Sequence, residues 1–374
     1  MNKKNIAIFH SADFHLGRQF RDFPESQETL SQARYGTLES TVHQANEKQA
    51  DLLTIAGDLF DRTSINKRDV QQAVRSIIQF SGKAAIVLPG NHDYLAEGGD
   101  LWQWFKEEAE EHIIIPEKQE PVDLRSFGIE AIIYPGPCHA KHSGENAIGW
   151  VKDIDKDPEL YHIGITHGSI EGVSPDFEQR YFPMTQKELN EAGVDVWLLG
   201  HTHITWPEKP DRKDIIFNPG TPEPDGFGCP HEGRAFFLSL NPNKQIRAEI
   251  ISTGQYRFEQ RSEQLENAQQ VNKLVESITK GDYSHVVLQL TVDGRLDPDA
   301  YEIWKEKIAE IRSNVLELRL DDSNLVRRVT KEQIRQEFAE DSFPHKLLSK
   351  FEGDEDEQAL QMAYELIREV GDER

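Results

Sequence analysis

The sequence is poor in the residues that build disulfide frameworks and membrane spans. Only two cysteines, Cys138 and Cys229, occur in 374 residues, and both lie in polar or proline-rich segments. A disulfide framework is therefore excluded, and a reducing cytoplasm is the expected location. No apolar stretch approaches the length of a membrane span, and the apolar run after the N-terminal lysines is too short for a signal peptide.

Basic residues are also scarce. The chain has 42 Lys and Arg against 66 Asp and Glu, a net charge of −24. Such a chain is not expected to bind nucleic acid through nonspecific attraction alone, because that affinity comes mainly from Lys and Arg. Five basic residues nevertheless follow two of the motifs described below. These five residues could line one groove or could be scattered over the surface, and the sequence does not distinguish these two arrangements. These residues are Arg18, Arg21, Arg62, Lys67 and Arg68.

Five short apolar runs each end in residues that commonly bind metals. The length of these runs and their Ile, Val and Leu content predict buried strands; they read IAIF, LLTIAG, AAIVLPG, HIGIT and VDVWLLG. The carboxyl ends of strands in an α/β sheet meet at one edge, and strand residues two apart share a face. We therefore expect one centre built from the polar residues that follow the runs. These are Asp13, His15, Asp58, Asn91, His92, His167, His201 and His203.

The types of ligand narrow the chemistry. Carboxylates, imidazoles and an Asn carbonyl, without a thiolate, suit Mn²⁺, Fe or Zn²⁺. Even without His92, seven such groups exceed the needs of one catalytic ion. Two divalent ions about 3.5–4 Å apart can use them all, and such a pair can act on the attacking and leaving oxygens of a phosphoryl displacement. Asp58, in the middle cluster, is the expected bridging ligand.

Each motif has an alternative interpretation when taken alone. A single histidine after a strand is more often a core or loop residue than a ligand, and GNHD and GHTH are also typical of turns. The combined pattern favours the metal site. Cys138, His139 and His142 are close enough in sequence to form a second metal site, but a surface or site-rim loop is the better interpretation. The histidines without ligand-like neighbours are His10, His43, His112, His162, His231, His285 and His345.

With its motifs D-x-H, G-D, G-N-H-D, H and G-H-x-H in order, the chain resembles the calcineurin-like metallophosphoesterases over roughly residues 5 to 240. The resemblance implies a β-sandwich flanked by helices. It also implies two ligand sets that share Asp58. One ion would be held by Asp13, His15, Asp58 and His203, and the other by Asp58, Asn91, His167 and His201.

His92 is left free of metal by this assignment. Beside two cations, an imidazole can protonate the leaving oxygen, and Asp93 is expected to orient the ring. Water activated by the ions can serve as the nucleophile, so no side-chain nucleophile is required.

The chain divides into four predicted segments of an α/β protein. Residues 1–255 form the phosphoesterase domain, and residues 256–280 form a connecting helix. Residues 281–330 read as strand, helix, strand, a small β-α-β cap. Residues 331–374 contain two amphipathic helices separated by the acidic loop EGDEDE. These helices either fold back on their own domain or dock on a partner.

A narrower resemblance follows from HSADFHLGR, GDLFD, NPGTPEPDGFG and the order cap then helical tail. Together they look like the SbcD family of bacterial DNA-repair nucleases, counterparts of the meiotic-recombination nucleases. The resemblance implies a Mn²⁺-dependent 3′-to-5′ exonuclease and endonuclease that acts on DNA ends in repair or recombination. It also implies a homodimer and an SMC-like ATPase partner of the SbcC type, bound through the C-terminal helices.

Substrate contacts are expected from Arg18, Asp61 and Arg62, which follow the first two motifs. Asp61 stands where archaeal and eukaryotic relatives have a histidine, and CPHEG replaces a plainer loop. The main alternative is a phosphodiesterase or phosphatase for small molecules or cyclic nucleotides, because these enzymes share the same motifs. A non-enzymatic metal-binding scaffold is disfavoured by the intact ligand set.

Overall fold

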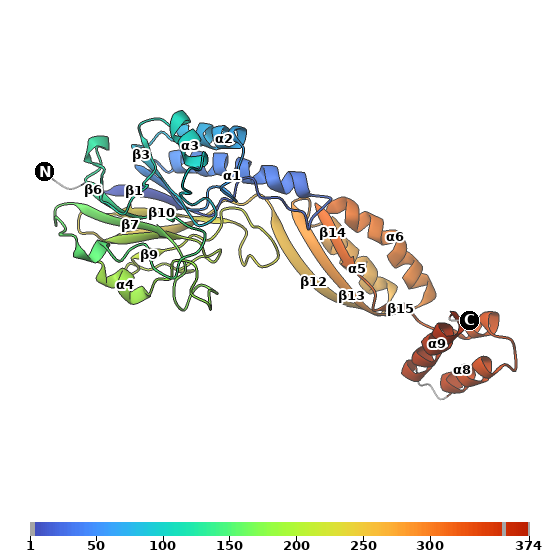
Figure 1. Cartoon of the computed structure of the whole chain (residues 1–374). Helices are drawn as coiled ribbons and strands as arrows, with labels where there is room; N and C mark the ends of the chain where they lie inside the picture. The colour runs from blue at the N-terminus through green and yellow to red at the C-terminus, as the bar shows by residue number, and fades with distance from the viewer. Residues whose placement is uncertain (1–3, 354–356, 373–374) are drawn as a thin grey trace. The chain divides into compact units, whose positions relative to one another are not determined.

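The structure is a computed structural model that describes residues 4–353 and 357–372. The chain folds as two compact units that divide between Phe258 and Glu259 (Figure 1). None of the helices in the described residues is both long enough and apolar enough to cross a membrane.

Two sheets form the first unit. The six-stranded sheet has the order β11-β10-β1-β2-β3-β4, in which β1 to β4 are parallel and the last two strands of the unit add an antiparallel edge. Its strands are β1 (Ile6–Ser11), β2 (Leu52–Ala56), β3 (Ala84–Leu88), β4 (Ile113–Ile114), β10 (Arg234–Leu240) and β11 (Ile246–Ser252).

The five-stranded sheet has the order β5-β6-β7-β8-β9, and all its pairs are parallel except β5 with β6. Strands β6 to β9 are almost entirely buried, as is usual for parallel strands covered on both faces, whereas the edge strand β5 is not. Its strands are β5 (Val122–Asp123), β6 (Ala131–Gly136), β7 (Tyr161–His167), β8 (Val196–Gly200) and β9 (Ile216–Phe217).

One hydrophobic cluster, with Ile8, Ile86, Ile163 and Leu198, joins residues of both sheets. A second packs three helices against the other face of the six-stranded sheet (Figure 1). A third, around Trp197, joins α4 to the five-stranded sheet. The predicted fold class, an α/β sandwich flanked by helices, is confirmed. The helices are α1 (Gln27–Glu47), α2 (Lys67–Ile78), α3 (Leu101–Glu108), α4 (Gln186–Glu191) and the short 3-10 turns η1 (Arg125–Phe127) and η2 (Val151–Asp153).

In the second unit, β13 and β14 are parallel and α6 connects them, so they form a β-α-β motif. The sheet has the order β12-β13-β14, and β15 also pairs with β13. Its core includes Leu288, Trp304 and Ile311. The elements are β12 (Arg257–Leu265), α5 (Ala268–Thr279), β13 (Val286–Leu296), α6 (Pro298–Asn314), β14 (Glu317–Asp321) and β15 (Leu325–Arg327).

The predicted connecting helix over residues 256–280 is present only in its second part, as α5, and its first part is wrong. Its first part is the strand β12, in which several polar side chains alternate between exposed and half-buried positions, as in a strand with one covered face. The helix begins later because the side chain of Asn267 accepts hydrogen bonds from the backbone N–H groups of Gln269 and Gln270.

The tail has three helices in the described residues, where two were predicted. They are α7 (Lys331–Glu337), α8 (Phe343–Gly353) and α9 (Glu357–Asp372). The additional helix, α7, is capped by Thr330, whose side chain accepts from the N–H of Gln333. A small core of Val329, Ile334, Leu348 and Leu360 holds the three together.

A buried histidine contacts both sheets of the first unit. His10 lies on β1, and its Nε2 is 3.1 Å from the carbonyl of Leu199 and 3.2 Å from that of Phe217. Because carbonyls only accept, Nε2 carries the proton, and Nδ1 accepts from the hydroxyl of Thr54 at 3.0 Å. Burial lowers the pKa of His10 to about 4, so the ring is neutral at pH 7.

We expect this histidine to make the protein sensitive to acid. Its pKa is lower in the folded state than the ordinary 6.5, so the unfolded chain binds the extra proton as the pH falls from 6.5 towards 4. The associated loss in the free energy of unfolding is on the order of 3 kcal/mol. In urea titrations with a chelator present, His10→Gln should lose less stability between pH 7 and pH 5 than the wild type. Parallel pH profiles for the two proteins would contradict this assignment.

Candidate metal centre

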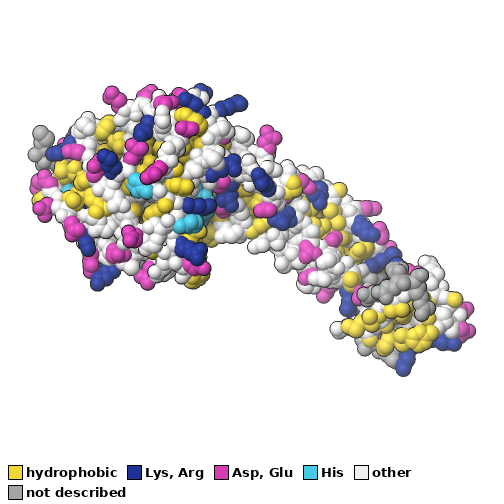
Figure 2. All heavy atoms as spheres, in the orientation of Figure 1, with side chains coloured by type: hydrophobic (Ala, Val, Ile, Leu, Met, Phe, Trp, Pro, Cys, Tyr) yellow, Lys and Arg dark blue, Asp and Glu magenta, His cyan; other side chains and the backbone are white. Residues whose placement is uncertain are grey.

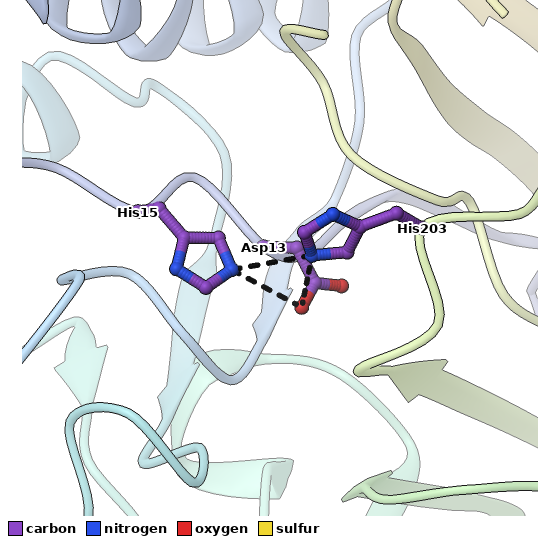
Figure 3. A group of neighbouring side chains, drawn as sticks. All are labelled: Asp13, His15 and His203. Carbon is purple, nitrogen blue, oxygen red and sulfur yellow. Dashed lines mark hydrogen bonds and ion pairs between the residues drawn. The ribbon is translucent and has the colours of Figure 1, made fainter. Parts of the chain in front are cut away.

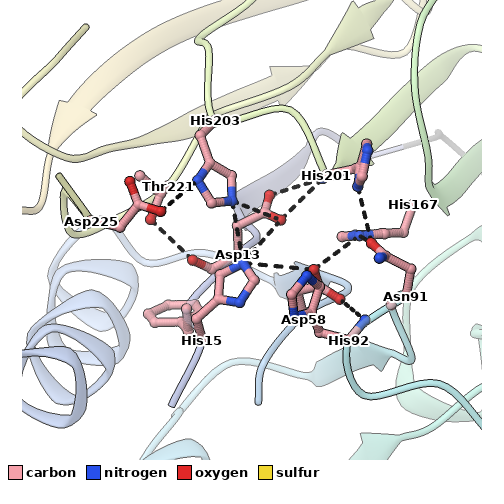
Figure 4. A network of polar contacts seen from close by, with 12 residues as sticks. Asp13, His15, Asp58, Asn91, His92, His167, His201, His203, Thr221 and Asp225 are labelled. Carbon is pink, nitrogen blue, oxygen red and sulfur yellow. Dashed lines mark hydrogen bonds and ion pairs between the residues drawn. The ribbon is translucent and has the colours of Figure 1, made fainter. Parts of the chain in front are cut away.

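The predicted ligands come together at one edge of the sandwich. Four loops that follow β1, β2, β3 and β8 carry six of them, and His167 is the last residue of β7. The first three strands belong to one sheet and the other two to the second sheet. Figure 4 shows their side chains converging from these loops. The ligands that converge are Asp13, His15, Asp58, Asn91, His167, His201 and His203.

The sequence pattern predicts that Asp13 with His15, and His201 with His203, point to the same side because strand residues two apart share a face. This prediction is wrong. β1 ends at Ser11 and β8 ends at Gly200, so both pairs lie beyond their strands. Instead, the backbone is left-handed at four ligand positions, a conformation that costs free energy in residues other than glycine and that clusters at functional sites. The φ angles are 59° at Asp13, 47° at His15, 52° at Asp58 and 95° at His201.

Glycine at position 57 makes the close approach of the second loop possible. Its φ is 88°, and an added Cβ would lie 2.1 Å from Nδ1 of His167. At Gly90, an added Cβ would lie 2.2 Å from Oδ1 of Asp58. The glycines of the GD and GN motifs therefore leave room for the ligands themselves.

The first group of donor atoms consists of Asp13, His15 and His203 (Figure 3). The Nε2 atoms of His15 and His203 are 3.2 Å apart. Oδ1 of Asp13 lies 3.7 Å from Nε2 of His203 and 4.0 Å from Nε2 of His15. Two donors bound to one ion at about 2.1 Å lie roughly 3–3.5 Å apart, which matches the separation of the two imidazole nitrogens.

The second group consists of Asp58, Asn91, His167 and His201. Oδ1 of Asn91 is 2.9 Å from Nε2 of His167 and 3.0 Å from Nδ1 of His201. Oδ2 of Asp58 is 3.3 Å from Nε2 of His167 and also 3.6 Å from Nε2 of His15. The same carboxylate oxygen of Asp58 therefore faces both groups, as a bridging ligand requires.

The charges of the site also fit two cations. Asp13 and Asp58 are buried, and no Lys or Arg in the described part of the chain forms an ion pair with either. Burial alone lowers the pKa of His203, but Asp13 and Asp225 outweigh it and raise that pKa to about 10. Asp58 raises the pKa of His167 to about 9 in the same way, against the effect of burial. An ionised carboxylate that is buried without a nearby positive charge is unfavourable, and divalent ions would provide that charge here.

His92 lies beside the two groups without joining the second. Its ring centroid is 4.8 Å from that of His15. Its Nδ1 is 2.9 Å from the backbone carbonyl of Asp61, and its backbone N–H donates to Asp58 at 2.8 Å. With Nδ1 committed to the carbonyl, Nε2 is the nitrogen that can exchange a proton with a substrate.

The expectation that Asp93 orients the ring of His92 is wrong. The carboxylate of Asp93 accepts the backbone N–H groups of Phe60 at 3.0 Å and Gly90 at 2.6 Å. It thereby joins the GDLFD loop to the GNHD loop, and the carbonyl of Asp61 orients the histidine instead. Burial, with a further contribution from the charge of Asp58, raises the pKa of Asp93 to about 7.

The three predicted substrate residues differ in their surroundings. Arg62 is exposed and donates a 3.5 Å hydrogen bond to the carbonyl of Gly17. Arg18 pairs with Asp225 at 3.2 Å. Oδ1 of Asp61 lies 3.5 Å from Nδ1 of His15, so this carboxylate faces a candidate ligand.

Asp225 is a site residue that the sequence analysis missed. Its Oδ2 lies 3.2 Å from Nδ1 of His203. Burial raises the pKa of Asp225, but His203 and Arg18 outweigh it and hold the pKa far below the ordinary value. The only signal in the sequence was the acidic pair in PEPDGFG, a segment quoted for its resemblance and not for its charges.

Cys138, His139 and His142 do not form a second centre in the described structure. The thiol of Cys138 is buried and points to the carbonyl of His167 at 3.5 Å. His139 is exposed, and the ring of His142 packs against Tyr181. This segment is a loop at the rim of the site, the interpretation that the sequence favoured.

The CPHEG segment is a turn held by its histidine. Nδ1 of His231 accepts from the N–H of Gly233 at 3.1 Å, and the thiol of Cys229 donates to the carbonyl of His231 at 3.3 Å.

Residues 6–205 match the calcineurin-like phosphoesterase family, and the chain belongs to this family. Family membership implies metal-dependent hydrolysis of a phosphoester, with two divalent ions as the usual cofactor. Together with the donor groups above, it supports a dinuclear centre whose metal is not specified.

Two curated proteins are similar over part of their length. The chain is 28% identical over 212 residues to an uncharacterized metallophosphoesterase, YhaO, of Bacillus subtilis, covering 53% of this chain and 49% of that protein. It is 23% identical over 264 residues to the DNA double-strand break repair protein Mre11 of Methanopyrus kandleri, covering 62% and 53%. The chain thus spans about half the length of these relatives.

A solved structure, the calcineurin-like phosphoesterase YfkN of Bacillus subtilis, superposes with a TM-score of 0.41 at 12% identity, over 67% of this chain and 91% of the other.

Because Asp58 faces both groups, we expect Asp58→Ala to lose more metal than His15→Ala, which removes a donor from one group only. Elemental analysis of the purified proteins after dialysis against Mn²⁺ measures the difference. Circular dichroism serves as the control for folding. Equal metal contents in the two variants would contradict the bridging position of Asp58.

Proposed function

We propose that this protein is a DNA nuclease of the SbcD type, a two-metal phosphodiesterase with 3′-to-5′ exonuclease and single-strand endonuclease activity on DNA ends. The observation that carries the phosphodiesterase part is the oxygen of Asp58 that faces both donor groups. The similarity to an archaeal Mre11 supports DNA as the substrate. Mn²⁺ suits the donor set of carboxylate, imidazole and amide oxygen.

The chain's own residues prepare the reaction. The bound ions would polarise the phosphodiester and lower the pKa of water. His92, oriented by the carbonyl of Asp61, presents Nε2 for proton transfer to the leaving oxygen. Asp93 keeps this histidine in place by joining the two loops on either side of it.

The positive charge that DNA requires is local. The net charge of −24 opposes binding of a polyanion. Figure 2, however, shows Lys and Arg side chains near exposed histidines on one face of the first unit, interspersed with Asp and Glu. Arg18 and Arg62 are close to the site in sequence and contact, since Arg18 pairs with Asp225 and Arg62 with the loop after His15. We propose that these two residues contact phosphates flanking the scissile bond.

A small-molecule or cyclic-nucleotide phosphodiesterase is the second candidate. A cavity of about 320 Å³ lies beside His201 and His203 and is lined also by Asp176 and Tyr181. Cavities of this size hold small ligands.

Cleavage assays with Mn²⁺ distinguish the two candidates. The substrates are linear duplex DNA, single-stranded DNA, a cyclic nucleotide and bis-nitrophenyl phosphate. We expect cleavage of both DNA substrates and of the activated ester. Cleavage of the cyclic nucleotide with intact DNA would exclude the nuclease and establish the second candidate.

If His92 protonates the leaving oxygen, His92→Gln should retain its metal and lose DNA cleavage by roughly 10²-fold or more. Nitrophenolate is a good leaving group that needs no proton. The variant should therefore be much less impaired on bis-nitrophenyl phosphate. Equal losses on both substrates, at normal metal content, would contradict the assigned proton transfer.

We also propose that the tail binds an SMC-like ATPase of the SbcC type. α8 and α9 leave an apolar groove of about 850 Å³, which includes Leu347 and Ile367. Phe343 is 73% exposed and Leu366 is 55% exposed. Figure 2 shows hydrophobic side chains gathered over these helices. The coiled-coil arms of such an ATPase present helices, and an apolar groove of this kind accepts a helix.

We expect Leu366→Asp to abolish co-purification with a co-expressed SMC-like ATPase, because the charge would be buried at the contact. Mn²⁺-dependent cleavage of single-stranded DNA should be unchanged. Gln358→Asp, an exposed position on the same helix, is the matched control. A Leu366→Asp protein that retains the ATPase would exclude this surface as the docking site.

A further inference from the structure

The two histidines of the first donor group share a feature that His167 lacks. The ring nitrogen of each that faces away from the group lies near a carboxylate. Nδ1 of His203 is 3.2 Å from Asp225, and Nδ1 of His15 is 3.5 Å from Asp61. By contrast, Nδ1 of His167 faces the backbone carbonyl of Ala56 at 2.9 Å.

Asp225 is held in place by a loop with buried anchors. Two residues earlier, the buried side chain of Glu223 accepts the N–H groups of Gln255 and Tyr256, each at 2.9 Å. The buried guanidinium of Arg34 donates to the carbonyl of Phe14 at 2.7 Å and to that of Glu223 at 3.2 Å. Arg34 thus fixes the Asp225 loop and the Asp13–His15 loop to the same helix, α1.

A further contact ties the loop to the first group itself. The hydroxyl of Thr221 lies 2.7 Å from the carbonyl of Glu223 and 3.0 Å from that of Asp13, so its single proton is shared between these two carbonyls. Asp225 is only 17% exposed, and its Oδ2 also receives Arg18 at 3.2 Å. Its carboxylate is therefore a fixed acceptor and not a freely rotating surface group.

We propose that Asp225 is a positioning residue for the metal centre. It holds the proton of His203 on Nδ1, so that the lone pair of Nε2 is aimed at the ion shared with Asp13 and His15. Asp61 also lies behind His15, but at 3.5 Å, and Nδ1 of His15 makes no hydrogen bond among the described residues. A carboxylate behind a metal-binding histidine fixes its tautomer and orientation and makes it a stronger ligand.

This inference rests on the metal centre and not on DNA as the substrate. Loss of a partner of this kind commonly lowers metal affinity by 10–100-fold. Because His203 belongs to one donor group, removal of Asp225 should affect one ion and leave the other. The second group, with Asn91, His167 and His201, makes no contact with Asp225 among the contacts of the described residues.

The test is a Mn²⁺ titration of the whole 374-residue chain, followed by calorimetry and by electron paramagnetic resonance. In Asp225→Ala we expect one of two sites to weaken by roughly 10–100-fold. At a metal concentration that fills both wild-type sites, the signal of a coupled manganese pair should then give way to that of a single ion. Asp225→Asn keeps an acceptor oxygen and should recover most of the affinity. Asp123→Ala, which removes a carboxylate from an exposed ion pair with Arg125, is the control.

A second measurement does not depend on the alanine variant folding. In the Zn²⁺-loaded wild type, the Nδ1 proton of His203 should give a downfield, slowly exchanging nitrogen-15-coupled signal, assigned by its loss in His203→Gln. Asp225→Asn should move it upfield. Unchanged affinity at both sites in Asp225→Ala, equal weakening of both sites, or the absence of this signal in the wild type would overturn the proposal. A failure of the nuclease proposal would leave both ion affinities and this signal as predicted here.

Discussion

The structure of this site depends on two buried carboxylates that have no Lys or Arg partner among the described residues. Asp13 and Asp58 lie within 4 Å of imidazole nitrogens and are shielded from water. Buried charges of this kind are tolerated only when opposite charge is fixed close by. The same carboxylates raise the pKa values of His167 and His203, because they stabilise the positively charged form of each imidazole. Divalent ions meet it and at the same time provide the chemistry of phosphoester hydrolysis.

The surrounding structure holds this arrangement together at a cost in local strain. Four candidate ligands have left-handed backbones, and the glycines at 57 and 90 leave room for ligand atoms. Around them, a second set of groups fixes the loops: Asp93 joins two motifs, and Arg34 joins two more. Strain at a functional site persists when its surroundings determine the geometry, and these buried hydrogen bonds do so.

The acidity of the chain and the proposed substrate are compatible because electrostatics act locally. A net charge of −24 describes the whole chain, whereas at the proposed site a phosphodiester would meet two cations and nearby basic side chains. Because the remaining acidic surface would repel DNA, DNA binding would depend on contacts at the metal site. On this view, the proposed ATPase contact through the apolar tail would be the means of holding a duplex end near the centre.

Through its family resemblance the sequence by itself predicted the sandwich class. It also identified the seven residues that approach one another, because each ends or follows a strand and the carboxyl ends of parallel strands meet at an edge. That these strands belong to two sheets was decided by the tertiary structure. The sequence did not determine how the seven residues approach. Asp13 and His15 point to the same place because both have positive φ angles, not because they alternate along a strand. The sequence of ligand types does not predict these φ angles. Only the tertiary structure placed Asp93 on Phe60 and Gly90 instead of His92, and Asp225 behind His203. These partners are up to 33 residues apart in the chain, and no local period relates them, so their pairing is decided by packing of the loops. Strand β12 and helix α7 were missed for a related reason. Side-chain to backbone hydrogen bonds from the caps Asn267 and Thr330 determine where α5 and α7 begin. The spacing of apolar residues does not reveal such caps.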